Sequence, residues 1–374
     1  MILRQLDKEI RNRLGDKKAI ILLGARQTGK TTLLKAILSN RADVIWFNGD
    51  NSTDRLAFAD VTVERLKKMI GRNRFVVIDE AQRISDIGIK MKLITDQIQS
   101  TQLIASGSSS FELANKINEP LTGRKWEYQI FPLSFSEMVA HSGLYQELKS
   151  LEDRLVFGYY PDVVTSEHDK MKTLFSLASD YLYKDILAWN KIKSSDKILK
   201  LLQALAYQLG NQVSYAELGR IVGLDNETVE SYIDLLEKAF IVFRLPSFSR
   251  NLRTELKKSR KIYFYDNGIR NAVISNFNTL SMRNDTGALW ENFLISERIK
   301  YTSYENIFSN KYFWRTTTQQ EIDYIEQREG KLFAYEFKWS KKAKAKFPSS
   351  FLNHYPNAET QIVHQDNFEG FLGV

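Results

Sequence analysis

The residues best suited to chemistry lie at positions 24–32, which read Gly24-Ala25-Arg26-Gln27-Thr28-Gly29-Lys30-Thr31-Thr32. Their spacing fits G-x-x-x-x-G-K-[ST], a glycine-rich loop whose backbone N–H groups point at phosphate oxygens. In this pattern Lys30 reaches the β- and γ-phosphates of a nucleotide, and the Thr31 hydroxyl binds Mg²⁺. The segment therefore predicts a site for a nucleotide and Mg²⁺ formed by all nine residues.

Two adjacent acids, Asp79 and Glu80, follow an apolar run at 75–78. We expect Asp79 to bind the hydration shell of Mg²⁺ and Glu80 to orient or deprotonate the attacking water. Two acids after a strand are also found in solvated turns. The phosphate loop upstream favours the catalytic interpretation, because hydrolysis needs both parts.

Two further residues are weaker catalytic candidates. Ser106 follows the apolar run 102–105, where P-loop ATPases of the AAA type place a polar residue that touches the γ-phosphate or the water. A simple Ser/Gly turn explains it nearly as well. Arg124 could stabilise transition-state charge in its own subunit or in a neighbouring one, or it is an ordinary surface arginine.

A third group of charged residues lies near the C-terminus, where Asp323 precedes Glu336 and Lys338. A hairpin around Gly330 would bring the two acids together. With Glu291 on a preceding helix, or Glu297 as the second choice, the set is similar to the metal site of PD-(D/E)xK nucleases. Charged residues on the open face of a hairpin often only meet water, so cleavage stays an open alternative.

The phosphate motifs need a sheet to position them. Apolar runs at 20–23, 44–47, 75–78 and 102–105 alternate with helical stretches. This alternation predicts an α/β fold, with a parallel sheet covered by helices on both faces. Ligands of such sheets bind at the carboxyl ends of the strands, which is where both phosphate motifs fall.

The length of 374 residues predicts several domains. We expect a P-loop ATPase core at 1–145, a helical linker at 146–195, a winged helix-turn-helix at 196–262 and a nuclease-like α/β domain at 263–374. In the third of these, Ser214 begins a helix that Gly223 ends, and a second helix follows from about residue 226.

The second of these helices carries acids along one face, namely Glu227, Glu230, Asp234 and Glu237. Phosphates would repel such a face, so we expect residues 226–238 to be a scaffold or a surface for a protein partner. If DNA binds, the basic segments 244–261 and 338–346 are the expected contacts. We predict that changing Glu230 and Asp234 to Lys leaves DNA affinity unchanged or higher.

The net charge of +8 favours a polyanionic partner such as nucleic acid over a neutral one. The chain has no Cys, which excludes disulfides and Cys-based metal sites. No apolar run reaches the length of a membrane span, and the first ten residues lack a signal-peptide core. A cytoplasmic protein without a membrane partner is expected, and a homo-oligomer is compatible.

Along nearly its whole length the chain resembles a family of bacterial and archaeal AAA-type ATPases with a C-terminal domain of unknown function. The resemblance rests on GARQTGKTT (24–32), VIDEAQ (77–82), FPLSFSE (131–137), YIDLLEK (232–238), SRNLR (249–253), GALWEN (287–292), FWR (313–315) and EIDY (321–324). It implies a core that hydrolyses ATP with Mg²⁺, a winged-helix middle and a nuclease-like end.

Two functions from different classes follow. The first is a Mg²⁺-dependent ATPase that acts with DNA and carries a metal-dependent nuclease site at Glu291, Asp323, Glu336 and Lys338. The second is a nucleotide-dependent switch that binds a protein partner and whose nuclease-like domain is inert. The acidic helix favours the second function, and the basic segments favour the first.

Overall fold

The computed structural model describes residues 2–108, 117, 120–166, 169–180, 195–248, 260–342 and 345–374. The chain forms two compact units, and the boundary between them falls after Pro132. The sequence placed the end of the first domain at residue 145. The difference arises because α7 (Phe135–Ser142) packs into the second unit, where Phe135 contacts Phe293 and Phe368.

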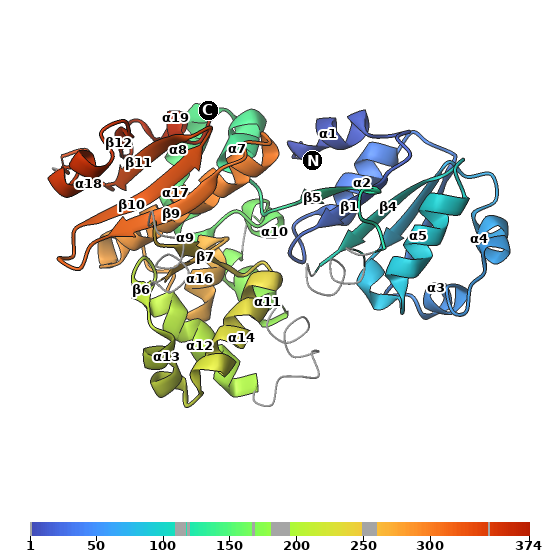
Figure 1. Ribbon diagram of the computed structural model, residues 1–374, viewed down its shortest axis with the longest axis horizontal. Coiled ribbons are helices and arrows are strands. Elements are labelled where there is room, and N and C mark those ends of the chain that lie inside the picture. The colour runs from blue at the N-terminus through green and yellow to red at the C-terminus, as the bar shows by residue number, and fades with distance from the viewer. Residues whose placement is uncertain are drawn as a thin grey trace. The chain divides into compact units, whose positions relative to one another are not determined.

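A parallel five-stranded sheet forms the centre of the first unit, with the order β2-β3-β4-β1-β5 (Figure 1). Its strands are β1 (Ala19–Leu23), β2 (Val44–Asn48), β3 (Phe75–Asp79), β4 (Gln102–Gly107) and β5 (Lys125–Gln129). The four strands expected from apolar runs are present. The sequence missed β5, because this edge strand is mostly half-exposed and contains no apolar run.

Helices cover both faces of this sheet, since every residue of β1, β3 and β4 is buried. The helices of the unit are α1 (Leu6–Asn12), α2 (Lys30–Leu38), α3 (Ser52–Ala57), α4 (Val63–Ile70), the 3₁₀ turn η1 (Ala81–Arg83) and α5 (Ile87–Gln97). The α/β class and the parallel sheet predicted for the P-loop part are therefore confirmed.

The second unit begins with helices and a small antiparallel sheet of order β6-β8-β7. Its elements to residue 264 are α7, α8 (Leu144–Lys149), α9 (Leu151–Phe157), α10 (Pro161–Val164), α11 (Lys170–Asp180), α12 (Ser195–Tyr207), β6 (Gln212–Val213), α13 (Tyr215–Val222), α14 (Asn226–Lys238), β7 (Val242–Pro246) and β8 (Arg260–Phe264). Ser214 caps α13, and the left-handed Gly223 ends it, as the sequence predicted.

A mixed sheet of order β12-β11-β10-β9 completes the second unit. Its elements are α16 (Asn267–Val273), η3 (Leu280–Met282), α17 (Thr286–Tyr304), β9 (Asn310–Arg315), β10 (Glu321–Arg328), β11 (Lys331–Phe337), α18 (Ser349–His354), β12 (Glu359–Val363) and α19 (Phe368–Phe371). Glu329 and Gly330 both have positive φ, as a tight two-residue hairpin requires. Only β12 runs parallel to its neighbour.

Both faces of this sheet are covered, contrary to the open hairpin face that the sequence suggested. Tyr335 and Phe337 on one face pack against Phe371. Ala334 on the other face lies in an apolar cluster with Trp314 and Phe351. Glu336 of β11 therefore sits in a packed environment rather than in water, whereas Lys331 at the start of the strand is exposed.

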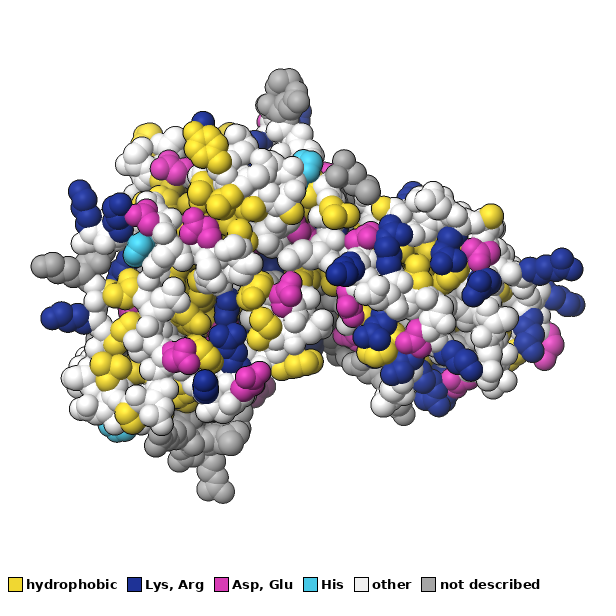
Figure 2. All heavy atoms as spheres, turned by 90° about the horizontal axis from the view of Figure 1, so that it is seen from above, with side chains coloured by type: hydrophobic (Ala, Val, Ile, Leu, Met, Phe, Trp, Pro, Cys, Tyr) yellow, Lys and Arg dark blue, Asp and Glu magenta, His cyan; other side chains and the backbone are white. Residues whose placement is uncertain are grey.

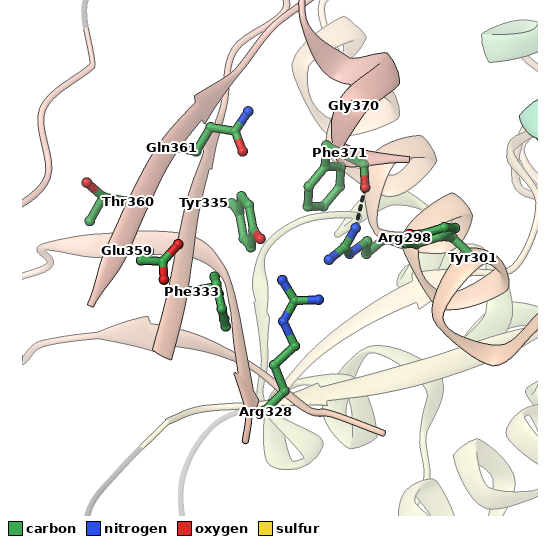
Figure 3. Close-up of a pocket in the computed structure, with 10 residues that line it drawn as sticks. All are labelled: Arg298, Tyr301, Arg328, Phe333, Tyr335, Glu359, Thr360, Gln361, Gly370 and Phe371. Carbon is green, nitrogen blue, oxygen red and sulfur yellow. Dashed lines mark hydrogen bonds between the residues drawn. The ribbon is translucent and has the colours of Figure 1, made fainter. Parts of the chain in front are cut away.

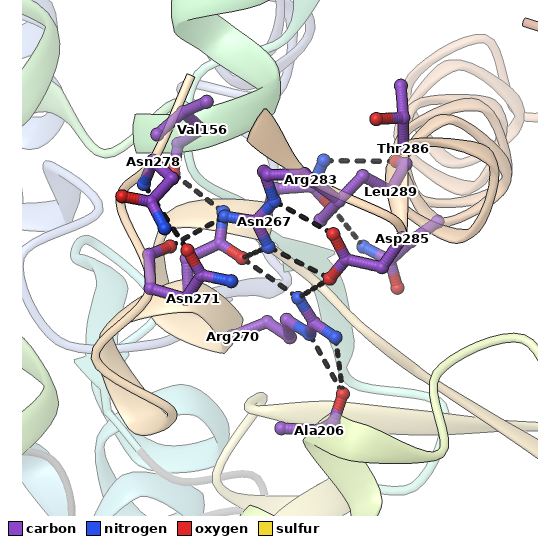
Figure 4. A network of polar contacts seen from close by, with 12 residues as sticks. Val156, Ala206, Asn267, Arg270, Asn271, Asn278, Arg283, Asp285, Thr286 and Leu289 are labelled. Atoms are coloured by element: carbon purple, nitrogen blue, oxygen red, sulfur yellow. Dashed lines mark hydrogen bonds and ion pairs between the residues drawn. The ribbon is translucent and has the colours of Figure 1, made fainter. Parts of the chain in front are cut away.

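A buried polar network ties the second unit together (Figure 4). Arg270 on α16 donates to the Ala206 carbonyl at the end of α12 and to Asp285 at the start of α17. Asn271 donates to the Val156 carbonyl on α9. The helices before residue 166 are thus integral to this unit rather than a separate linker. No helix in the described part of the chain is long and apolar enough to cross a membrane.

Candidate functional site

The phosphate loop connects β1 to α2 in a conformation that needs its glycines. A Cβ on Gly24 would lie 2.1 Å from the Ile130 carbonyl oxygen, so only glycine fits there. Gly29 has φ of 93° and lies at the start of α2, where the helix N-terminus favours an anion. Gln27 also has a positive φ of 56°. The loop is therefore shaped as a cradle for phosphate.

Two cations hold the loop in place. The Nζ atom of Lys30 donates to the carbonyl oxygens of Gly24 at 2.8 Å and Ala25 at 2.7 Å. Arg4 donates to the carbonyl oxygens of Thr28 at 2.5 Å and of Phe131 at 2.7 Å. The sequence missed Arg4, because no motif links the first residues to the loop.

Asp79 is the central acid of this site. Its Oδ2 atom accepts a hydrogen bond of 2.7 Å from the Thr31 hydroxyl, and its Oδ1 atom accepts one from Ser106. Ser106 is fully buried and Asp79 is 8% exposed. The carboxyl ends of β3 and β4 thus meet α2 at one point, as neighbouring parallel strands should.

Glu80 lies beside this group and adopts a left-handed conformation with φ of 49°. Its carboxylate accepts a hydrogen bond of 2.6 Å from Gln82 Nε2, which also donates to the Ser108 hydroxyl at 3.0 Å. The strained backbone and the amide together fix where the carboxylate points. Neither Gln82 nor Ser108 was assigned a role from the sequence, although Gln82 ends the motif VIDEAQ.

These residues fit ATP and Mg²⁺. The cradle of backbone N–H groups and Lys30 suits phosphate oxygens, and the Thr31 hydroxyl with the Asp79 carboxylate offers the hard oxygen ligands that Mg²⁺ prefers. Thr32 and Arg26, which the sequence also assigned to the nucleotide, lie on α2 and in the loop.

Arg124 does not lie near this site. It directly precedes β5, whose residue Lys125 pairs with Ala19 at the start of β1. The phosphate loop follows the other end of β1, five strand residues or roughly 16 Å away. Arg124 instead forms a 2.8 Å ion pair with Asp96. The expectation that it acts in its own subunit is therefore corrected.

The C-terminal acids do lie together. Lys338 Nζ is 3.0 Å from Glu336 Oε2 and 3.9 Å from Asp323 Oδ2. Burial, with the nearby carboxylates of Glu291 and Glu336, raises the pKa of Asp323 to about 8. This is the electrostatic signature of acids crowded into a desolvated site.

A buried lysine that the sequence had assigned to the DNA-binding segment completes this group. Lys261 Nζ lies 3.0 Å from Glu291 Oε1 and 2.5 Å from Glu321 Oε1, and Tyr263 donates to the same Glu291 oxygen. Burial acts to lower the pKa of Lys261, but the carboxylates of Glu291, Asp323 and Glu321 raise it overall. Lys261 thus neutralises part of the acid group.

The predicted metal set is not assembled as a binding site in this conformation. Across the described ranges, no group of three or more acidic or histidine side chains is arranged to hold a metal. Glu297, the second choice for the helix acid, is excluded from the group. It is 3% exposed, and it accepts hydrogen bonds from the Phe135 backbone and from Lys300, so it anchors α7 to α17.

The basic residues of segment 244–261 that the structure describes, Arg244, Arg260 and Lys261, are all paired with acids. Arg244 pairs with Asp234 and Glu237, and Arg260 pairs with Glu230. Three of the four acids on this face of α14 are therefore paired with two arginines, and changing Glu230 and Asp234 to Lys would also break these ion pairs. Arg250, Arg253, Lys257, Lys258 and Lys344 lie outside the described residues.

In the segment 338–346, Lys341 pairs with Asp366 at 2.8 Å, whereas Lys342 is exposed. On the face that Figure 2 shows, basic side chains alternate with acidic ones rather than gathering in one field. This distribution gives DNA no single large basic surface on that face.

Comparisons with known proteins support the P-loop fold of the first unit. Residues 16–139 match the family model described as "AAA domain". Residues 148–280 and 286–369 match two families described as "Domain of unknown function", DUF8612 and DUF4143. The family match thus supports an AAA-type P-loop ATPase domain in the first unit.

The chain is similar to proteins of bacteria and archaea over most of its length. An uncharacterized protein of Mycobacterium tuberculosis is 26% identical over 90% of this chain and 73% of its own length. An uncharacterized protein of Methanocaldococcus jannaschii is 23% identical over 86% of this chain and 74% of its own length. Among solved structures, the Walker-type ATPase PABY2304 of Pyrococcus abyssi has the same fold, with a TM-score of 0.52 and 15% identity over 73% of this chain and 96% of that one.

Proposed function

We propose that this protein hydrolyses ATP with Mg²⁺ and uses the nucleotide state to control an action of its second unit on DNA. The observation that carries the ATPase part is the bridge from Thr31 through Asp79 to Ser106. It joins the phosphate loop, the acid after β3 and the polar residue after β4 at one point.

In this proposal each residue has a defined task. Lys30 exchanges its loop carbonyls for phosphate oxygens, and Thr31 with Asp79 holds the Mg²⁺. The metal supplies charge stabilisation for the phosphates. Glu80, oriented by Gln82, accepts the proton of the attacking water. Ser106 keeps Asp79 in position.

Two features of the second unit support an action on DNA. The order of helices and strands from α12 to β8 fits the expected winged helix-turn-helix. Asp323, Glu336 and Lys338 lie near one another, and these are the residue types that metal-dependent phosphodiester cleavage would use. On this reading, residues 263–374 are a nuclease-like domain.

A second candidate function is a nucleotide-dependent switch that binds a protein partner. The observation that favours it is Lys261, whose amine already occupies the Glu291 carboxylate. A permanent internal cation would leave the acid group inert. The charge-compensated surface of α14 would then be the docking surface for a protein.

The first experiment measures steady-state ATP hydrolysis by the full chain with and without duplex, single-stranded and branched DNA. Glu80→Gln should lower turnover about 100-fold or more, as loss of a general base does. Glu64→Gln, which changes an exposed acid on α4, is the matched control. A rate of ATP hydrolysis that stays the same with every form of DNA would favour the switch that binds a protein partner.

Cleavage is tested separately with Mg²⁺ and a labelled form of the DNA that stimulates hydrolysis best. Asp323→Ala should abolish any cleavage and leave ATP hydrolysis in place, because the two sites lie in different units. Cleavage that survives this change would come from another source.

A further inference from the structure

A cavity of about 490 Å³ lies in the second unit beside β11 and β12. Its lining includes Arg298, Arg328, Phe333, Tyr335 and Phe371. Figure 3 shows the two guanidinium groups directed toward the space between the strands and the C-terminal helix, with the rings of Phe333 and Tyr335 along one wall. Its volume is typical of a pocket for a small molecule.

This cavity is separate from the acid group. Side chains alternate along β11, so Phe333 and Tyr335 project to one face while Glu336 projects to the other. The candidate nuclease site and the cavity therefore lie on opposite faces of the same sheet. Neither the proposed ATPase nor the proposed cleavage uses the cavity.

The two arginines are held differently. Arg298 forms a bidentate pair with Glu326 at 2.7 and 2.8 Å and donates to the Phe371 carbonyl, so its donors face fixed partners. Arg328 lies 3.9 Å from the same carboxylate, and its guanidinium stacks over Phe333 at 4.1 Å. Within the described part of the chain, the guanidinium of Arg328 donates no hydrogen bond to another residue. The N–H donors of this planar guanidinium are thus available to a ligand.

The charges around the cavity do not balance. Glu326 is fully buried and forms ion pairs with Arg298 and Arg328; its cross-strand neighbour on β9 is a third cation, Lys311. Burial lowers the pKa of Lys311; Glu326 acts to raise it, and Arg298 adds a smaller lowering effect. The other ionised neighbours, Glu359 and Lys331, are exposed and pair with each other at 3.9 Å.

We propose that this cavity binds a small planar anion, namely a ring that carries a phosphate or a carboxylate. The guanidinium of Arg328 can donate two parallel hydrogen bonds to two oxygens of either a phosphate or a carboxylate. The rings of Phe333, Tyr335 and Phe371 supply a flat apolar wall for the ring of the ligand. Gln361, from the edge strand β12, adds a polar side chain at the rim.

The test is calorimetric titration of the full chain with phenyl phosphate and with benzoate, which distinguish the two anionic groups. Phenol and benzamide are the uncharged counterparts, and inorganic phosphate tests whether the ring is needed. Binding should persist in Lys30→Ala, which separates the cavity from the phosphate loop. At least one ring-bearing anion should bind about tenfold or more tightly than its uncharged counterpart.

Variants then assign the binding to the cavity. Arg328→Gln should weaken it about tenfold or more, and Arg328→Lys should restore only part of it because the fork is lost. Arg72→Gln, the same change at an exposed arginine of the first unit, is the matched control and should have no effect. Equal binding of the uncharged probes, full binding by Arg328→Gln, or no saturable binding of any probe would overturn the proposal.

Discussion

The amine of Lys261 on β8 lies 3.0 Å from the carboxylate of Glu291 on α17, and the lysine side chain is 1% exposed. A third residue, Glu321 on β10, accepts from the same amine. The small sheet, the long helix and the mixed sheet of the second unit are therefore joined by one buried ion pair network.

Removing the amine should destabilise the second unit, because it leaves buried carboxylates without a counter-ion. We expect Lys261→Met to lower the free energy of unfolding by about 3–5 kcal/mol, as measured by urea denaturation. Adding Glu291→Gln should recover part of this loss, because the two residues interact directly. Strictly additive effects of the two changes would contradict the network.

Ser106→Ala should slow ATP hydrolysis more than it weakens ATP binding, because the hydroxyl holds Asp79 rather than the bulk of the nucleotide. A hydrogen bond to a charged group contributes about 1.5–3 kcal/mol, so a loss of roughly ten- to a hundredfold in turnover is expected. Measuring the nucleotide affinity and the steady-state rate of ATP hydrolysis of the variant will show whether the rate falls more than the affinity. Ser39→Ala, at an exposed position after α2, serves as the control, and equal losses in both variants would refute the role.

Arg124→Ala should leave the ATPase rate of the isolated subunit unchanged. Arg124 lies at the amino ends of the strands, whereas the phosphate loop lies at their carboxyl ends. The rate should be measured over a range of protein concentrations, with size-exclusion chromatography to follow assembly. A loss that grows with assembly would show that Arg124 acts on a neighbouring subunit. A loss at every dilution would contradict the geometry.

The stability of the second unit should fall in strong acid through Asp285. Burial acts to raise the pKa of Asp285, but hydrogen bonds from Arg283 and Arg270 lower it to about 2 (Figure 4). A depressed pKa stabilises the folded state at pH values above the ordinary pKa of 3.8, and this stabilisation is lost as the pH falls toward 2.

We therefore expect Asp285→Asn to destabilise the protein near pH 6 and to have little effect near pH 2. Chemical denaturation at a series of pH values measures the difference between the variant and the natural chain. Glu227→Gln on α14 changes an exposed acid and is the control for charge alone. A difference that stays constant with pH would show that the loss is one of packing.

The sequence by itself determined the residues of the phosphate loop, the acids Asp79 and Glu80, and the parallel strands that present them. These features are local. A loop of fixed residue spacing between an apolar strand and a helix can be recognised from a short stretch of sequence. The edge strand β5 escaped because its half-exposed residues give no such pattern.

Only the tertiary structure decided what each charged residue does. Arg4, Gln82 and Lys261 bind Thr28, Ser108 and Glu291, which lie in other segments of the chain. Strand register places Arg124 away from the phosphate loop. The sequence shows which residues are charged but not how far apart they lie in the fold. Ion pairs and pKa shifts depend on distances of a few ångströms and on burial.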